Sequence, residues 1–218
     1  LPRPTQIFQT IVDNFDTLMG HTWVTAYEMV LGYLLAIGIA VPLAVAITSY
    51  RRFDKFITPI LLFFQTVPKI AIAPVFLVWL GFGPASKILL AFLISFFPIV
   101  IDTAIGLRSV SPEMIDLARS MGATKLQIFM RFRMPTALPY FFGGLKVAAT
   151  LAVVGAVVGE FVGSDEGLGY LLLIAGANLD SPLLFAAIVA LTALGLILFY
   201  VIEVLEHYLI PWHVSRRA

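Results

Sequence analysis

The stretch VLGYLLAIGIAVPLAVAI at positions 30–47 decides the fold class, because it carries no charged side chain. A helix of this length crosses most of the hydrocarbon core of a bilayer. The rest of the chain is similar: 60% of its 218 residues are hydrophobic and 12% are charged, whereas a soluble domain has about 25% charged residues. This composition excludes a soluble enzyme, a nucleic-acid-binding protein and a disordered chain, and it favours a polytopic membrane protein.

Five stretches are long and apolar enough to be membrane-spanning helices. They lie at 23–49, 56–80, 85–107, 140–162 and 183–209. The second contains Pro68 and Pro74, so we expect it to be broken or bent near QTVPKIAIAP, because a proline removes a backbone donor from a helix. We therefore predict an all-α polytopic bundle that forms a single transmembrane domain over 1–218.

The basic residues indicate the orientation of this bundle. If each stretch crosses the membrane once, most of the 14 Lys and Arg fall in three segments on one side: Arg51, Arg52 and Lys55; Arg108, Arg119, Lys125, Arg131 and Arg133; Arg216 and Arg217. The positive-inside rule makes that side cytoplasmic. Five spans would leave the N-terminus outside, so we expect a sixth span upstream of Leu1.

The longest polar segment is RSVSPEMIDLARSMGATKLQIFMRFRMPTALP at 108–139. Ser111 is suited to capping a helix that begins at the following proline. Gly122 then predicts a small, flexible break before a second short helix, which we expect Pro135 and Pro139 to end. Two interpretations remain open for this helix–Gly–helix element: an amphipathic loop lying on lipid headgroups, or a docking element for a cytoplasmic partner.

This segment resembles the EAA loop of binding-protein-dependent ABC importer permeases. The family pattern is E-A-A, three residues, G-A, and later I-x-L-P, and the positions that match here are Asp116, Leu117 and Ala118, then Gly122 and Ala123, then Phe132, Met134 and Pro135. The spacing is intact, although Asp, Leu, Phe and Met depart from the pattern. QTVPKIAIAPVFLVWLGFG and GEFVGSDEGLGYLL also resemble the subgroup that imports nitrate, taurine, alkanesulfonates or thiamine-precursor pyrimidines, so the resemblance covers nearly the whole chain.

The resemblance implies a type I ABC importer permease, usually with six spans, in the bacterial inner (plasma) membrane. Its loop docks on a separate ATPase subunit, and the implied contacts are Asp116, Leu117, Ala118, Arg119, Gly122 and Ala123. The expected partners are two ATPase copies, a second permease copy, a periplasmic substrate-binding protein and lipid. The solute would be small and anionic or heterocyclic, and the loop and the C-terminus would be cytoplasmic.

The chain itself is expected to be neither an enzyme nor a cofactor-binding protein. It contains no G-x-x-x-x-G-K-[ST] sequence, the loop that cradles phosphates, so ATP and Mg would be bound by the partner. His21, His207 and His213 form no metal pattern, and there is no cysteine. We therefore predict no metal site and no catalytic residue.

Polar residues inside membrane spans are costly and suggest function. Gln65 and Lys69 lie one turn apart at the proline break and are candidates for the solute pathway, although a purely structural role there is equally open. Glu160 is a candidate gate or an interfacial residue. We expect Lys146 to snorkel toward the interface and Asp102 to pair with a basic residue of the loop.

The stretch at 140–162 also contains a pattern of small residues. Gly155 and Gly159 form a G-x-x-x-G pair, which favours close helix packing within the chain or between two copies.

The competing functions are a secondary transporter or channel that needs no ATPase, and an intramembrane enzyme. Inverted repeats would favour the former, but none is visible, and the spans lack the paired acids that an intramembrane enzyme would need.

Overall fold

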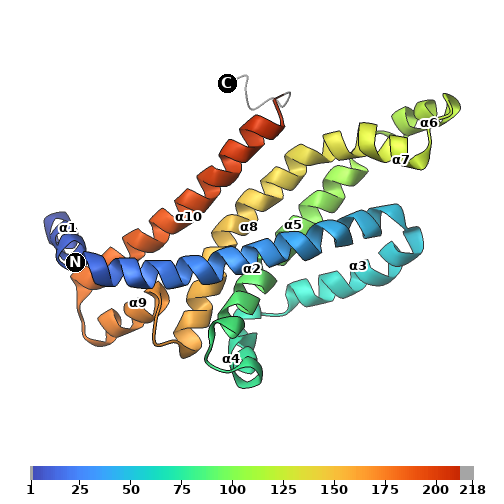
Figure 1. The fold of residues 1–218 in the computed structure, drawn as a ribbon. Helices are drawn as coiled ribbons and strands as arrows, with labels where there is room; N and C mark the ends of the chain where they lie inside the picture. The colour runs from blue at the N-terminus through green and yellow to red at the C-terminus, as the bar shows by residue number, and fades with distance from the viewer. Residues whose placement is uncertain (1, 212–218) are drawn as a thin grey trace. The chain divides into compact units, whose positions relative to one another are not determined.

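The computed structural model describes residues 2–211, which form helices and contain no strand (Figure 1). In chain order the elements are α1 (Pro4–Asp13), α2 (Phe15–Ser49), α3 (Arg51–Thr66), α4 (Lys69–Leu80), α5 (Pro84–Arg108), α6 (Pro112–Ser120), α7 (Lys125–Ile128), the π-helical turn η1 (Phe129–Arg133), α8 (Met134–Gly163), α9 (Leu168–Ala177) and α10 (Ser181–Leu209). The all-α prediction is confirmed. Arg216, Arg217 and His213 lie outside the described residues.

Four helical stretches of the described chain are long and apolar enough to cross a membrane: α2, α5, the continuous stretch Lys125–Gly163, and α10. The helices α3 and α4 together make a fifth candidate. Between them Val67 leaves the helical conformation, with φ −65° and ψ 129°, as expected for a residue that precedes a proline. Four of the five predicted spans and the break at QTVPKIAIAP are therefore confirmed, and the second span, made of α3 and α4, stays a prediction.

The chain divides into two compact units. The first comprises Leu1–Ala36, Pro68–Ser95 and Ala149–Tyr200, and the second comprises Ile37–Val67, Phe96–Ala148 and Val201–Ala218. Four of the five boundaries fall inside α2, α5, α8 and α10, and the fifth falls between α3 and α4. Each of these long helices therefore contributes one part to each unit.

Small residues hold the first unit together at the contact between α5 and α8. A Cβ atom placed on Gly155 would lie 2.6 Å from the Cα atom of Ala91, and one on Gly159 would lie 2.9 Å from the Cα atom of Lys87. Glycine at both positions lets the two backbones touch, as in other membrane helix pairs. The G-x-x-x-G prediction is confirmed as a contact within one chain.

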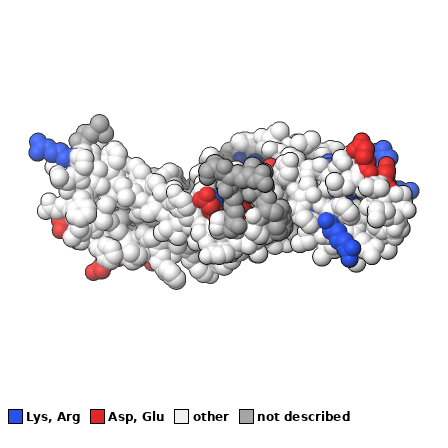
Figure 2. Space-filling model, turned by 90° about the horizontal axis from the view of Figure 1, so that it is seen from above, with Lys and Arg blue, Asp and Glu red and all other residues white. Residues whose placement is uncertain are grey.

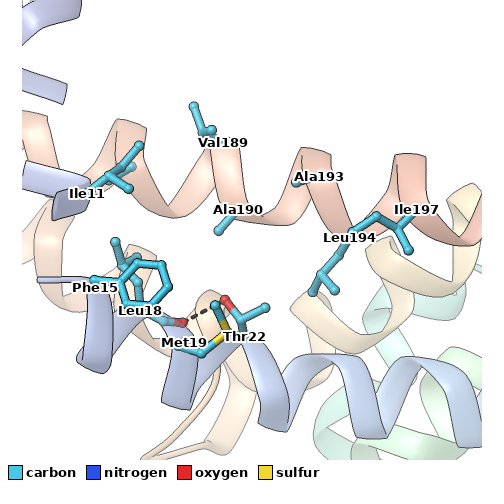
Figure 3. A pocket seen from close by; sticks show the side chains of 11 residues that line it. Ile11, Phe15, Leu18, Met19, Thr22, Val189, Ala190, Ala193, Leu194 and Ile197 are labelled. Atoms are coloured by element: carbon cyan, nitrogen blue, oxygen red, sulfur yellow. Dashed lines mark hydrogen bonds between the residues drawn. The ribbon is translucent and has the colours of Figure 1, made fainter. Parts of the chain in front are cut away.

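An apolar groove of about 310 Å³ runs between α1–α2 and α10 in the first unit. Figure 3 shows Phe15 and Met19 facing Ala190 and Leu194 across it. The one hydroxyl in its wall, on Thr22, donates to the Leu18 carbonyl of its own helix at 2.6 Å. The wall is therefore apolar. In the view of Figure 2, uncharged residues make up most of the visible surface.

The second unit contains the base of the polar 108–139 segment. A Cβ atom on Gly106 of α5 would lie 2.8 Å from the Cβ atom of Tyr140 and 2.9 Å from the backbone of Ala137 on α8. A Cβ atom on Gly144 would lie 2.9 Å from the Cβ atom of Asp102. These two close contacts between α5 and α8 are called the loop stem below.

One expectation about this segment is wrong: Pro135 and Pro139 do not end its second helix. The helix α7 continues through η1 into α8, so that Pro135 is the second residue of α8 and Pro139 lies inside it. In η1 the backbone hydrogen bonds change register, because the N–H group of Met134 donates to the carbonyl of Phe129, five residues earlier, and not to the carbonyl four residues earlier. Such π-turns change the backbone hydrogen-bond register locally; Pro135 lies just after this change, and Pro139 lies further along α8.

Candidate functional site: the 108–139 loop and the buried acids

The first loop helix, α6, has a defined start. Ser111 has extended dihedral angles, and its hydroxyl accepts a hydrogen bond from the N–H group of Met114 at 3.4 Å. Pro112 occupies the first helical position, where its missing N–H group is no loss. The predicted cap is confirmed.

The end of α6 is set by Gly122. This residue has a φ of +81°, its N–H group donates to the Arg119 carbonyl at 2.9 Å, and the next N–H group, of Ala123, donates to the Ala118 carbonyl at 3.0 Å. These two bonds form a Schellman C-cap, for which glycine is preferred. A Cβ atom on Gly122 would meet nothing within 4 Å, so the backbone conformation alone favours glycine. The predicted break is confirmed, and it is a hydrogen-bonded turn.

A reciprocal capping box starts α7. The side chain of Thr124 accepts from the N–H group of Gln127 at 3.3 Å, and the Gln127 side chain accepts from the N–H group of Thr124 at 2.8 Å. Two donors that would otherwise be unsatisfied at the helix start are thereby paired. The connection between α6 and α7 is therefore fixed on both sides of the turn.

The loop presents apolar side chains at its surface. Leu117 is 61% exposed, Met121 80% and Leu126 70%. Asp116 and Arg119, also exposed, form an ion pair of 3.2 Å within α6. Exposed apolar side chains on a polar segment are suited to contact with a protein partner or with lipid headgroups, the two interpretations left open by the sequence.

The buried residue of α6 is Ala118, which is 5% exposed. In this structure it therefore packs against its own chain, and the partner contact implied for it stays a prediction. Gly122 is exposed and Ala123 half-buried. Of the six implied coupling residues, Asp116, Leu117, Arg119 and Gly122 are thus the ones that a partner can reach.

Polar contacts hold both ends of the loop. At its start, the Nη2 atom of Arg108 lies 2.8 Å from Oδ1 of Asp54, and the Thr58 hydroxyl donates to the same oxygen at 2.7 Å. At its end, Arg133 donates to the Thr48 carbonyl at 3.5 Å. Sequence analysis missed these contacts because the partners are far apart in the chain and share no motif.

The other membrane charges differ from expectation. Lys146 does not extend freely to the interface, because its Nζ atom lies 2.6 Å from Oε2 of Glu206 on α10. Asp102 faces Gly144 and makes no ion pair with any residue that the structure describes. The pairing expected between Asp102 and a basic loop residue is therefore not found.

The three pathway candidates occupy different settings. Gln65 is exposed near the end of α3, and Lys69 is the half-buried first residue of α4. Glu160 is only 1% exposed: its Oε1 atom accepts from the Thr25 hydroxyl at 2.6 Å, and its Oε2 atom accepts from the N–H group of Gly169. The Thr25 hydroxyl also accepts from the N–H group of Leu168 at 2.8 Å. Glu160 and Thr25 together therefore fix the start of α9.

A buried ion pair lies in the same unit. Glu28 is 1% and Lys87 4% exposed, and the Lys87 Nζ atom lies 3.5 Å from Oε1 of Glu28. Lys87 also donates to the Ser164 hydroxyl at 2.7 Å. A buried ion pair is stable only when its remaining hydrogen-bonding capacity is largely satisfied. The sequence offered no signal for this pair, since Glu28 and Lys87 belong to different helices.

Comparison with known proteins identifies the family. Residues 22–212 match the family described as binding-protein-dependent transport system inner membrane component, and the chain belongs to it. The chain is 38% identical over 213 residues to a probable ABC transporter permease protein of Haemophilus influenzae, covering 98% of this chain and 86% of that protein. It is also 38% identical over 217 residues to the formylaminopyrimidine transport permease protein ThiX of Halalkalibacterium halodurans, with coverages of 99% and 87%.

Other relatives agree with this assignment. The putative aliphatic sulfonates transport permease protein SsuC of Bacillus subtilis is 31% identical over 217 residues, with coverages of 99% and 79%. The fold is similar to a chain of the MetNI methionine ABC transporter in an inward-facing conformation, with a TM-score of 0.77, 19% identity, and coverages of 90% and 97%. The predicted type I permease fold is confirmed, and the chain is a membrane-embedded permease subunit of an ABC transporter.

Proposed function

We propose that this chain forms the membrane pathway of an ATP-driven importer for a small heterocyclic or anionic solute delivered by a periplasmic binding protein. The family description, which names binding-protein-dependent transport, supports the delivery step. The solute class rests on relatives whose names specify formylaminopyrimidine and aliphatic sulfonates. Gln65 and Lys69 remain our candidates for the pathway, and Glu160 would join them only in a conformation that opens its present hydrogen bonds.

The loop of α6 and α7 is proposed to dock on a separate ATPase subunit that binds ATP and Mg. The observation that carries this proposal is a capped helix with exposed Leu117 and Met121 on an otherwise polar segment. Because the chain has no phosphate-binding loop of its own, the energy of ATP must reach it by contact. Nucleotide binding would then bias the two states of the permease through its differential affinity for them.

The orientation and stoichiometry follow from the same reasoning. The excess of Lys and Arg in the segments around α3 and in the loop supports a cytoplasmic loop and C-terminus in the bacterial inner membrane. The proposed complex contains two permease copies and two ATPase copies. An ATPase-independent secondary transporter is not favoured, since the relatives are ABC transporter permeases.

The test compares the same substitution at two glycines. Gly122 and Gly81 have φ values of +81° and +80°, and a Cβ atom on either meets nothing within 4 Å. Gly81 also has a ψ of −178°, a conformation that essentially only glycine adopts, so Asp at Gly81 is strained at least as much as Asp at Gly122, but only Gly122 belongs to the loop. We expect Gly122→Asp to lose the ATPase subunit on copurification from membranes, and Gly81→Asp to retain it at equal stoichiometry.

Membrane insertion of both variants is checked by their yield in the membrane fraction and by gel filtration in detergent. Retention of the ATPase by Gly122→Asp, or its loss from both variants alike, would contradict docking through the loop. Solute uptake that is driven by an ion gradient, with no ATPase copurifying, would contradict the importer assignment.

A further inference from the structure

Three consecutive backbone N–H groups at the start of α9 donate to side chains of α2 and α8. The bonds are, in chain order, Gly167 to Nδ1 of His21 at 3.0 Å, Leu168 to the Thr25 hydroxyl at 2.8 Å, and Gly169 to Oε2 of Glu160. The first N–H groups of a helix have no acceptor within the helix itself. Side chains of two neighbouring helices therefore hold the start of α9, and two of the three acceptors lie one turn apart on α2.

His21 is the acceptor that protonation converts into a donor. A neutral imidazole accepts at one ring nitrogen and donates at the other, so the bond from Gly167 places the ring proton on Nε2. An imidazolium donates from both nitrogens and has no acceptor left. Protonated His21 would therefore direct an N–H group at the N–H group of Gly167. It would also bring a positive charge to the N-terminal end of α9, which is the positive end of the helix dipole.

The surroundings of His21 allow this change of charge. The side chain is half-buried and precedes the predicted span at 23–49, and its ring lies 6.1 Å from that of Tyr170. The other charged or titratable groups on the elements around it are Asp16 and Glu28 on α2, Lys87 on α5, Glu160 on α8, and Asp165 and Glu166 in the α8–α9 loop. Carboxylates outnumber the one ammonium group, and nearby negative charge favours the charged form of an imidazole.

We infer that His21 is a pH-sensitive latch, which holds the α8–α9 loop to α2 while it is neutral and releases Gly167 when it is protonated. Histidine side chains change charge between about pH 5 and 8, so mild acidification is expected to open the latch. The opening is local, because Leu168 and Leu171 are packed in an apolar core with α10, and such contacts do not depend on charge.

The latch lies at the end of α8 opposite to the 108–139 loop. Since α8 belongs to a helical stretch long enough to cross the membrane, its two ends lie on opposite faces. In the orientation proposed above, the latch is therefore on the extracytoplasmic side, where external acid would reach it. The hydrogen bond itself does not depend on that orientation or on the proposed ATPase docking.

The test uses the absence of cysteine from the chain. The variant Glu166→Cys places a single thiol beside Gly167, and this thiol carries a nitroxide spin label. The full labelled chain is placed in lipid nanodiscs, and its electron paramagnetic resonance spectrum gives the ratio of mobile to immobile label at about pH 7.5 and about pH 5.0. Loss of one hydrogen bond predicts that this ratio rises about two- to tenfold in acid.

Two substitutions at the latch separate its acceptor from its titration. In His21→Asn the amide oxygen is bonded to Cγ, as Nδ1 is in histidine, so it can accept from the N–H group of Gly167 but does not titrate. We expect the label to stay immobile at both pH values. In His21→Ala the acceptor is lost, and we expect the label to be mobile at both. His207→Asn, which changes a histidine of α10, is the matched control and is expected to respond as the parent does.

Three results would overturn the latch. The first is an equal ratio at the two pH values in the parent, and the second is an immobile label in His21→Ala at about pH 7.5. The third is a pH response that persists in His21→Asn, which would assign it to the carboxyl groups instead. If His21→Ala does not fold, as judged by gel filtration, the comparison of the parent with His21→Asn decides the question. A label at Asp13→Cys on α1 is expected to show no change with pH in any variant, which excludes a general loosening of the chain.

Discussion

The contact of Gly155 with α5 yields the sharpest stability prediction. A Cβ atom at this position would lie 2.6 Å from Cα of Ala91 and 3.0 Å from the carbonyl of Leu90. Both neighbours are backbone atoms, so no side chain can rotate away. In the Gly155→Ala variant α5 and α8 must therefore separate by several tenths of an ångström, and overpacking of this kind costs about 1–3 kcal/mol.

A matched control on the same helix isolates that cost. A Cβ atom on Gly143 meets nothing within 4 Å, so Gly143→Ala gains the better helix propensity of alanine, up to about 1 kcal/mol, without a clash. Gly155→Ala gains the same propensity, so the difference between the two variants is the overpacking cost. For a chain of this size each kcal/mol shifts the melting temperature by about 2–4 °C, which makes the expected difference about 2–12 °C.

The measurement is thermal unfolding of both variants in the same detergent, followed by tryptophan fluorescence at one scan rate. Gly143→Ala is expected to melt at or above the temperature of the parent, and Gly155→Ala below it. If the two variants melt together, or if Gly155→Ala is the more stable, the backbone contact between α5 and α8 does not exist as described.

Two further predictions concern buried polar groups. Thr25→Val removes the hydroxyl that donates to Glu160 and accepts from the N–H group of Leu168, so we expect it to destabilise the chain by about 1–3 kcal/mol. Thr25→Ser keeps a hydroxyl and should retain the melting temperature of the parent. An unchanged melting temperature in Thr25→Val would contradict the contact. The Nζ atom of Lys146 lies 2.6 Å from Oε2 of Glu206, so a double-mutant cycle of Lys146→Met and Glu206→Gln should give a coupling free energy of about 0.5–3 kcal/mol. Shifts in melting temperature that simply add in the double variant would show that the pair does not form.

Local patterns carried most of what could be predicted from the sequence. The spans follow from apolar runs, the break in the second follows from Pro68, and the turn after α6 follows from Gly122. Each of these depends on the residue itself and on its immediate neighbours, because an apolar run partitions into lipid and a proline or glycine restricts or releases its own backbone. The C-terminal ends of the predicted stretches are therefore those expected to within one residue, whereas α2, α3 and α8 begin five to eight residues earlier than predicted.

The buried polar contacts could not be predicted in this way. The Thr25 hydroxyl reaches Glu160 across 135 positions of sequence, and no residue between them signals the pairing. The continuation of α7 into α8 was missed for a related reason. Pro135 predicts the end of a helix because it lacks a backbone N–H group. The π-turn before it depends instead on the hydrogen-bond register of the backbone at Phe129–Arg133, which no single residue indicates. The pairing of Thr25 with Glu160 therefore has no local signal, whereas at Pro135 the hydrogen bonding of the π-turn overrides the local one.

The loop stem, rather than the ion pair beside it, is the stronger mechanical link between the 108–139 loop and the membrane helices. The side chains of Arg108 and Asp54 are 49% and 30% exposed, and ion pairs with such access to solvent stabilise by about 0–1 kcal/mol. At Gly106, by contrast, the backbones of α5 and α8 are in direct contact, and close-packed contacts resist displacement. A force applied to α6 would therefore reach α5 and α8 together, and the role of Asp54 and Thr48 would be to set the direction in which the loop leaves the stem.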